Sequence, residues 1–434
     1  MMKYLLLSLG CSKNLVDSEK FAAIMQAYGI KPTEYIDKAD IVLVNSCAFL
    51  CSALGELDDT LFEILMETKG RKVKVIVTGC VTKRGLEEFK ELFPEVNYWI
   101  ALKDFAAFEK YLLRYVLPKG SSKKSISFDK RVKLQDGQFA YLRIADGCDN
   151  HCSYCTIPEI RGKMVSEPIE NLVKEAKALQ KYGRELVLVA QDTCMYGLDL
   201  YQEKALPRLI EALHDIPGFD WIRILYMHPD HFEYSWTELW HKYPKLLPYF
   251  DMPIQHVSDR IIHLMNRKKG YDQLKHLFDH IKTEVPNAVF RTTLMVGYPT
   301  ETKEEYKLME KFLQEVDILH AGVFAYSPEK EGTPYNPPED FDWHKGEKLE
   351  TALAMKIAKA KGEKMQRFVN TRQQVLIEGY DPLMEAFVGR LWFQAPEIDG
   401  IVYVDNLPSD SPLLVEVEVT DALADELWCD ASPS

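Results

Sequence analysis

Three cysteines in a short segment near the middle of the chain have the spacing of metal ligands. Cys148, Cys152 and Cys155 are separated by three and two residues, and they follow the apolar run 139–144. Three thiolates on one loop can bind three irons of a cubane iron–sulfur cluster and leave the fourth iron open for chemistry. A zinc site completed by His151 is the alternative. It fits poorly because His151 lies directly beside Cys152, whereas structural zinc sites favour two separated ligand pairs.

A second set of three cysteines follows the first strands that the sequence predicts. Residues 4–9, 41–44 and 73–77 are apolar, β-branched runs separated by helical patterns, which predicts parallel strands covered on both faces. Each run leads into a cysteine, in order Cys11, Cys47 and Cys80. The carboxyl ends of parallel strands meet at one edge of a sheet, so we expect these thiols to be neighbours and to form a second cluster site. Three ordinary buried cysteines are the alternative.

The composition is that of a globular protein with several domains. The chain has 434 residues, 47% of them hydrophobic, and no apolar run approaches the roughly 18 residues that span a bilayer. Residues 1–11 resemble a lipoprotein signal only superficially, because the apolar core 4–9 is shorter than the roughly 7–15 residues of a real signal. We therefore expect a buried first strand, a cytoplasmic protein and no membrane partner. Nine cysteines in a reducing compartment then indicate metal ligation rather than disulfides.

The middle of the chain repeats a strand and a helix six times. Residues 117–137 read as a linker, and the strand candidates that follow lie at 141–145, 186–190, 221–226, 249–252, 289–296 and 321–326. Repeated βα units predict a partial (β/α)6 barrel, open at one side to a large substrate. Cys148 follows the first of these strands, so we expect its loop at the carboxyl end of the barrel, where barrel sites form.

The end of the chain is acidic and has a different pattern. After a helical stretch at 343–368, short strand candidates at 373–377, 385–392, 400–404 and 413–419 predict a small antiparallel β-barrel. Residues 371–434 contain thirteen Asp or Glu, two Arg and no Lys, a net charge of −11 out of −13 for the whole chain. A domain this acidic repels phosphate and attracts a basic protein surface.

The two cysteine sets and the terminal barrel together resemble one enzyme family over essentially the whole chain. The spacing of Cys148 to Cys155, with Tyr154 before the last cysteine, resembles the radical S-adenosylmethionine (SAM) enzymes. The complete arrangement resembles the radical SAM methylthiotransferases. Four segments are similar to the branch that modifies an aspartate of a ribosomal protein, at 10–19, 189–193, 253–259 and 395–400. The resemblance implies an N-terminal cluster domain (1–116), a linker (117–137), a radical SAM domain (138–368) and an OB-like TRAM domain (369–434).

The family also implies a reaction, its cofactors and its partners. A methylthio group replaces one hydrogen on the β-carbon of an aspartate of the small-subunit ribosomal protein S-twelve. Two [4Fe-4S] clusters and SAM are the implied cofactors. The cluster on Cys148, Cys152 and Cys155 cleaves SAM to a radical, and the one on Cys11, Cys47 and Cys80 carries the sulfur, which a second SAM methylates. An electron donor and a sulfur source are required, and the acidic TRAM domain is expected to bind the basic ribosomal protein.

Further residues are candidates for SAM binding. By resemblance Tyr154 packs beside the adenine, and Gly297 and Glu301 belong to a turn next to SAM. Gln191, Asp192 and His256 follow predicted barrel strands and could contact SAM, with loop capping or simple packing as the alternative. The chain departs from the family's pattern where Thr300 replaces a glycine of the turn and where Val165 and Glu167 replace arginines.

Two other functions compete with this one. A tRNA adenosine methylthiotransferase would use the same chemistry, but the acidic terminal domain opposes a nucleic-acid substrate. A non-enzymatic iron–sulfur carrier would bind clusters without cleaving SAM.

Overall fold

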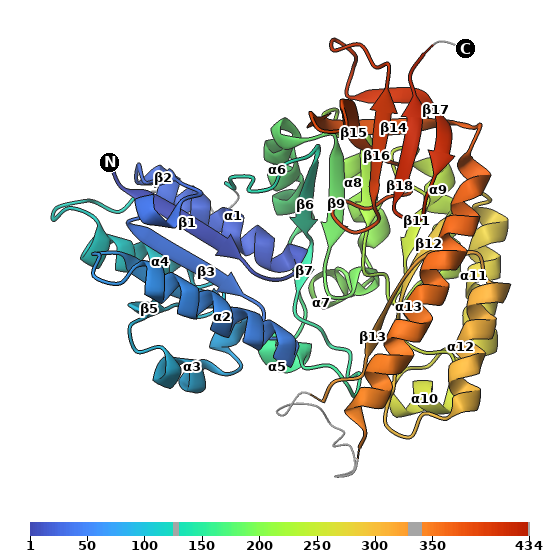
Figure 1. Ribbon diagram of the computed structural model, residues 1–434, viewed down its shortest axis with the longest axis horizontal. Coiled ribbons are helices and arrows are strands. Elements are labelled where there is room, and N and C mark those ends of the chain that lie inside the picture. The colour runs from blue at the N-terminus through green and yellow to red at the C-terminus, as the bar shows by residue number, and fades with distance from the viewer. Residues whose placement is uncertain (125–129, 329–340, 433–434) are drawn as a thin grey trace.

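The computed structural model describes residues 1–124, 130–328 and 341–432 and has three parts (Figure 1). An α/β sheet domain comes first, six central strands flanked by helices come next, and a closed β-barrel comes last. The mixed α/β class predicted from the sequence is therefore confirmed. The stretch 125–129 of the predicted linker lies outside the described residues, as do 329–340 of the predicted radical SAM domain and 433–434 of the predicted TRAM domain.

The N-terminal sheet has five parallel strands in the order β2-β1-β3-β4-β5. Their bounds are Lys3–Ser8 (β1), Lys31–Pro32 (β2), Ile41–Ser46 (β3), Lys74–Gly79 (β4) and Tyr98–Trp99 (β5). Side chains of β3 alternate between two cores, with Val42 and Val44 facing one and Ile41 and Leu43 the other. Helices α2 (Cys51–Glu67) and α3 (Leu86–Leu92) cover the first face, and α1 (Ser12–Ala27) and α4 (Phe105–Tyr111) the second. Burial on both faces explains the continuous apolar runs.

The six central strands are parallel within two three-stranded sheets, ordered β10-β9-β6 and β11-β12-β13. The strands are Phe139–Arg143 (β6), Glu185–Val189 (β9), Trp221–Ile224 (β10), Tyr249–Asp251 (β11), Val289–Val296 (β12) and Ile318–Ala325 (β13). Within the described chain β6 and β13 do not pair, so the barrel is partial, as predicted. The helices that pack their apolar faces on these strands include Ile169–Leu179 (α6), Leu206–His214 (α8), Tyr271–Glu284 (α11), Lys303–Glu315 (α12) and Trp343–Met365 (α13).

The C-terminal barrel closes with five strands in the order β14-β15-β16-β18-β17. They are Arg372–Asp381 (β14), Ala386–Leu391 (β15), Ile401–Asp405 (β16), Leu414–Ala422 (β17) and Glu426–Asp430 (β18), the last of which the sequence pattern did not reveal. The pair β16–β18 is parallel, so the barrel is not antiparallel throughout. An odd number of strands in a closed ring cannot alternate in direction everywhere, so one parallel pair is required.

A buried ionic cluster joins this barrel to the central strands. The carboxylate of Glu185, at the start of β9, accepts from Arg223 Nε at 2.6 Å and lies 2.7 Å from Arg390 Nη2 of β15. Arg390 also pairs with Glu378 of β14 at 2.9 Å. Burial alone would raise the pKa of Glu185, but the two guanidinium groups outweigh it and hold the pKa below its usual value.

We expect Glu185→Gln to lower the free energy of unfolding by about 3 kcal/mol or more, because two buried guanidinium groups lose a shared partner. Urea unfolding at pH 7, followed by tryptophan fluorescence, measures this. Glu416→Gln is the matched control, since Glu416 pairs with Arg372 on the exposed face of the same barrel and should change stability little. Because the folded pKa of Glu185 is depressed, its contribution is present above the pKa of unfolded Glu and is lost as the pH falls through the folded pKa. Equal losses in both variants would contradict this account.

Candidate active site

A single cavity of about 350 Å³ brings the two cysteine sets together. All six candidate cluster cysteines line it, although they come from the N-terminal sheet and from the loop after β6 and β7 (Ala145–Asp146). The remaining cysteines, Cys51, Cys194 and Cys429, do not line it. The other lining residues are Lys13, Phe49, Asn150, Tyr154, Ile157, Arg161, Gln191, Tyr226, His228, Pro253, Gln255, Arg267, Thr293 and Phe324.

The N-terminal set lies at the carboxyl edge of three adjacent strands. β1, β3 and β4 pair side by side, and each ends immediately before the turn that carries its cysteine. The side-chain oxygen of Asn14 lies between two of these thiols, 3.9 Å from Cys11 Sγ and 3.8 Å from Cys80 Sγ. Gly79 permits the close approach, since its φ is +103° and a Cβ there would lie 2.3 Å from the carbonyl oxygen of Ser46.

Arg161 reaches this set from the central part of the chain. It ends helix α5 (Ile157–Arg161), which follows the other cysteine loop, and its Nη2 lies 3.6 Å from Cys80 Sγ. The pKa of Cys80 falls to about 6, first because of a hydrogen bond from Cys47 and then because of the Arg161 charge. A thiol that readily becomes a thiolate is a suitable iron ligand.

The second cysteine set is held by its own backbone. Cys148 N donates to Gly162 O at 3.0 Å, and Cys155 N donates to Cys152 O at 3.1 Å. Gly147 has a φ of +83°, and a Cβ there would lie 2.1 Å from Lys163 O, so only glycine fits. Burial raises the pKa of Cys148 to about 11 and that of Cys155 to about 12. Without iron, these thiols are therefore protonated at pH 7 and are poor nucleophiles. A bound iron would supply the positive charge that stabilises their thiolates. The donor sets thus fit iron–sulfur clusters.

Two of the predicted SAM contacts line the cavity. Tyr154 packs there beside the cysteines, and the Gln191 amide donates to Asp146 Oδ1 at 3.0 Å. The Gln191 Oε1 and Gln255 Oε1 oxygens are buried without a hydrogen-bond partner in the described chain, which leaves them available to a polar ligand. Asp192 does not line the cavity. Its carboxylate accepts from Asn150 Nδ2 at 2.9 Å and so supports the cysteine loop.

The other predicted contacts lie away from the cysteines. Gly297 and Glu301 line a separate cavity of about 400 Å³, where Glu301 Oε2 accepts from the backbone N–H groups of Gly297 and Tyr298. His256 is fully buried, and its Nδ1 accepts from Ser258 N at 2.9 Å. Thr300, which stands where the family's turn has a glycine, has a φ of +72° in the left-handed region, with strain for a β-branched residue.

The sequence did not mark several cavity residues as SAM contacts. Tyr226 lies two residues after β10, and Gln255, part of the family-like segment 253–259, lies four residues after β11. Their φ values of 60° and 68° are positive, which is uncommon for such side chains. Their position just after barrel strands was the available signal. Lys13, Arg161 and Arg267 carried no comparable pattern. Val165 and Glu167, which replace family arginines, do not line the cavity.

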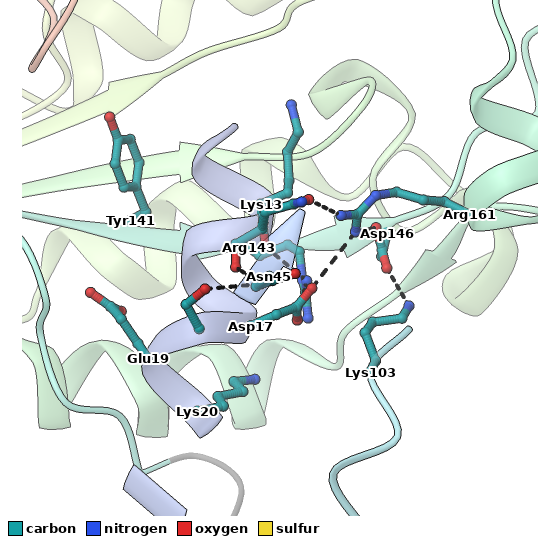
Figure 2. Close-up of polar contacts among 12 residues, drawn as sticks. Lys13, Asp17, Glu19, Lys20, Asn45, Lys103, Tyr141, Arg143, Asp146 and Arg161 are labelled. Carbon is teal, nitrogen blue, oxygen red and sulfur yellow. Dashed lines mark hydrogen bonds and ion pairs between the residues drawn. The ribbon is translucent and has the colours of Figure 1, made fainter. Parts of the chain in front are cut away.

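Buried ion pairs fix the N-terminal part against the central part (Figure 2). Asp17 of α1 accepts from Arg143 of β6 at 2.7 Å, and Arg161 donates to Asp146 at 2.9 Å. Lys103 of the N-terminal part also pairs with Asp146. Burial would raise the pKa of Asp146, but Arg143, Arg161 and Lys103 outweigh it and lower the pKa well below its usual range. The carboxylate therefore stays ionised, and the distance between the two cysteine sets is set by charged contacts.

Comparisons with known proteins identify the family. The radical SAM superfamily matches residues 142–313, the uncharacterized protein family UPF0004 residues 3–101 and the TRAM domain residues 369–431. The ribosomal protein uS12 methylthiotransferase RimO of Aquifex aeolicus is 40% identical over 93% of this chain and 91% of its own length. That of Caldicellulosiruptor saccharolyticus is 36% identical over 98% and 99%. The chain belongs to the RimO family. It is a radical SAM enzyme that transfers a methylthio group, as the sequence predicted.

A solved structure shows the same fold. The cobalamin-dependent S-adenosylmethionine radical enzyme OxsB superposes with a TM-score of 0.50 at 11% identity, covering 80% of this chain. The match spans 55% of the OxsB chain, so the likeness concerns the fold alone. No helix within the described ranges is long and apolar enough to cross a membrane.

We expect Arg161→Met to lower the free energy of unfolding of the cluster-free protein by about 3 kcal/mol, because Asp146 loses a buried partner. Urea unfolding measures the loss. Arg208→Met is the control, since Arg208 makes an exposed pair with Glu203 and a surface contact with the Tyr201 ring and should change little. An unchanged midpoint for Arg161→Met would show that the other cations of the network suffice.

Proposed function

We propose that this protein inserts a methylthio group at the β-carbon of an aspartate of ribosomal protein uS12, with SAM and two [4Fe-4S] clusters. The observation that carries the proposal is the shared cavity, because sulfur insertion requires the radical source and the sulfur carrier to reach one substrate carbon. Cys148, Cys152 and Cys155 would hold one cluster. Cys11, Cys47 and Cys80 would hold the other. Both sets have three thiols rather than four, which leaves one open iron on each.

The groups bound there would supply reductive cleavage of SAM to a carbon radical, the sulfur atom and the methyl group. The chain's own residues position these groups. Tyr154 and Gln191 are the direct SAM contacts that we propose, since both line the cavity. Asp192 acts through Asn150 of the cysteine loop. Gly297 and Glu301 hold the turn after β12, and His256 Nε2 lies 3.7 Å from Glu301 Oε1. We propose that these three residues support the SAM-binding end of the barrel without lining the cavity.

We assign the domain roles from the cysteine sets, and the substrate-binding part from its charge. We assign 1–116 to the sulfur-carrying cluster, 138–368 to radical formation, and 369–434, after the linker 117–137, to binding basic uS12 in the cytoplasm. An electron donor and a sulfur source would serve the two clusters. Six acidic side chains of the terminal part are exposed and make no ion pair with Lys or Arg in the described chain: Glu385, Glu397, Asp405, Asp410, Asp421 and Glu426. Such a surface opposes tRNA, the alternative substrate.

Cysteine substitutions test the proposed division of labour. We expect the wild-type protein, reconstituted anaerobically with iron, sulfide, SAM and a reductant, to add a methylthio mass to one aspartate of uS12. Cys148→Ala should form no 5′-deoxyadenosine, because the open iron that binds SAM is lost. Cys80→Ala should still form 5′-deoxyadenosine but transfer no sulfur, and Cys51→Ala is the control outside the cavity. Mass spectrometry and chromatography measure both products. Unmodified uS12 together with a modified tRNA would overturn the proposal.

The acidic barrel gives a separate expectation. Neutralising three exposed carboxylates, in Asp405→Asn/Asp421→Asn/Glu426→Gln, should weaken uS12 binding several-fold at low salt, with a smaller effect at high salt because salt screens exposed charges. Titration calorimetry at two ionic strengths measures the change, and 5′-deoxyadenosine formation without uS12 should stay at the wild-type rate. Tighter binding of uS12 by the triple variant would contradict this role.

A further inference from the structure

Lys13 carries a buried positive charge inside the cavity. It is the second residue of α1, two positions after Cys11, and its side chain lines the cavity with 7% of the residue exposed. The ammonium nitrogen lies 3.5 Å from the centroid of the Tyr226 ring, a cation–π contact. Lysines are almost never fully buried unless they are paired, and this one has the Tyr226 side chain as a partner but no carboxylate.

No carboxylate of the described chain lies within 4.0 Å of this ammonium. Two acidic groups of the ion-pair network are already engaged, Asp17 by Arg143 and Asp146 by Arg161. Figure 2 shows the Lys13 side chain turned away from both, with its nitrogen free of dashed lines. The charge is therefore directed at the cavity and not at the ion-pair network.

The electrostatic surroundings of Lys13 also disfavour a positive charge. The first turn of a helix carries the positive end of the helix dipole, and α1 is 16 residues long. Arg161 adds a second positive charge at the same wall of the cavity. Burying an ammonium there costs free energy, which the Tyr226 ring offsets in part and an approaching anion would offset further. Residues that break such a rule concentrate at functional sites.

We propose that Lys13 determines specificity by binding the carboxylate of the acceptor side chain. The inference rests on the proposed function. The carboxylate carbon of aspartate is bonded directly to the β-carbon. An ammonium that binds the carboxylate oxygens therefore also positions the reacting carbon, which is one bond from the carboxylate carbon. Such a charge-assisted hydrogen bond is stronger than a neutral one and is made poorly by an amide or a nucleobase. Lys13 would thus select an acidic protein side chain.

The other cations of the cavity are less available. Arg161 donates to Asp146 and to Asn14, so its guanidinium is already used. Arg267 donates through Nη1 to the carbonyl oxygens of Pro253 and Ile254. Its titratable neighbours are Tyr154 and Cys152 on the radical-forming side, and the carboxylate of Asp230. Lys13 is on the helix that begins at the sulfur-carrying set, where the acceptor carbon must arrive.

The test compares binding of two peptides to the reconstituted enzyme with SAM, one carrying the acceptor aspartate of uS12 and one with asparagine in its place. Wild type and Lys13→Arg should prefer the aspartate peptide by about tenfold or more, and Lys13→Met should bind both equally. Lys83→Met is the matched control, because Lys83 is exposed, follows the Cys80 turn and lies outside the cavity. Iron content is measured for every variant, and 5′-deoxyadenosine formation without peptide should match wild type in the Lys83→Met control.

Several results would overturn the inference. A wild-type enzyme that binds both peptides equally contradicts it without any variant, so the test stands even if Lys13→Met fails to load its clusters. A Lys13→Met protein that keeps the preference for aspartate, or that loses SAM affinity instead, would assign the ammonium to another ligand. In each of these cases wild-type methylthiolation of uS12 would persist, which separates failure of this inference from failure of the proposed function.

Discussion

The arrangement of the whole molecule depends on a polar face of one helix. Helix α1 buries apolar side chains such as Phe21 and Ile24 against the N-terminal sheet, and on its other side it buries Asn14, Asp17 and Glu19. Asp17 pairs with Arg143, and Glu19 accepts from Arg131 Nε at 2.8 Å, while Arg131 also pairs with Glu175 of α6. Unpaired carboxylates could not remain buried there. The contact between the N-terminal and central parts therefore forms only in the one relative position that pairs these charges. That relative position sets the distance between the two cysteine sets.

Ionic joints of this kind favour a defined geometry more than high stability. Apolar surfaces of similar area could slide by a fraction of an ångström with little change in free energy, whereas buried pairs lose most of their energy when a hydrogen bond breaks. The terminal barrel is attached in the same way, through Glu185, Arg223 and Arg390. Three parts of the chain are thus joined by buried charges, and two of them, the N-terminal and the central part, line the cavity. A defined geometry there suits radical chemistry, because a small displacement of the reacting carbon slows such a reaction greatly.

The sequence predicted those features that arise from local pattern and from the geometry of parallel sheets. Continuous β-branched runs announced the parallel strands, and the rule that their carboxyl ends share an edge brought Cys11, Cys47 and Cys80 together. Strands as short as β2 and β5, at two residues each, leave no pattern to read. Long-range contacts such as Arg161 to Cys80 were also beyond prediction, because nothing local in residues 157–161 marks a side chain that crosses to another domain. The φ of +72° at Thr300, where the family has a glycine, could likewise not be read from the sequence, because a β-branched residue rarely adopts it.

The outer surface and the cavity of the protein carry charges of opposite sign, which would act on a substrate at different distances. The outer surface of the terminal barrel is acidic, while the cavity wall carries Lys13, Arg161 and Arg267. Long-range attraction acts on the net charge of a partner and favours a basic protein, whereas contact inside the cavity acts on a single group and favours an anion. A nucleic acid satisfies the second condition and fails the first, and a generally acidic protein does the same. A basic protein with one acidic side chain exposed at the right place satisfies both. Under the proposed function, the two opposed charge patterns would therefore select a substrate that neither would select alone.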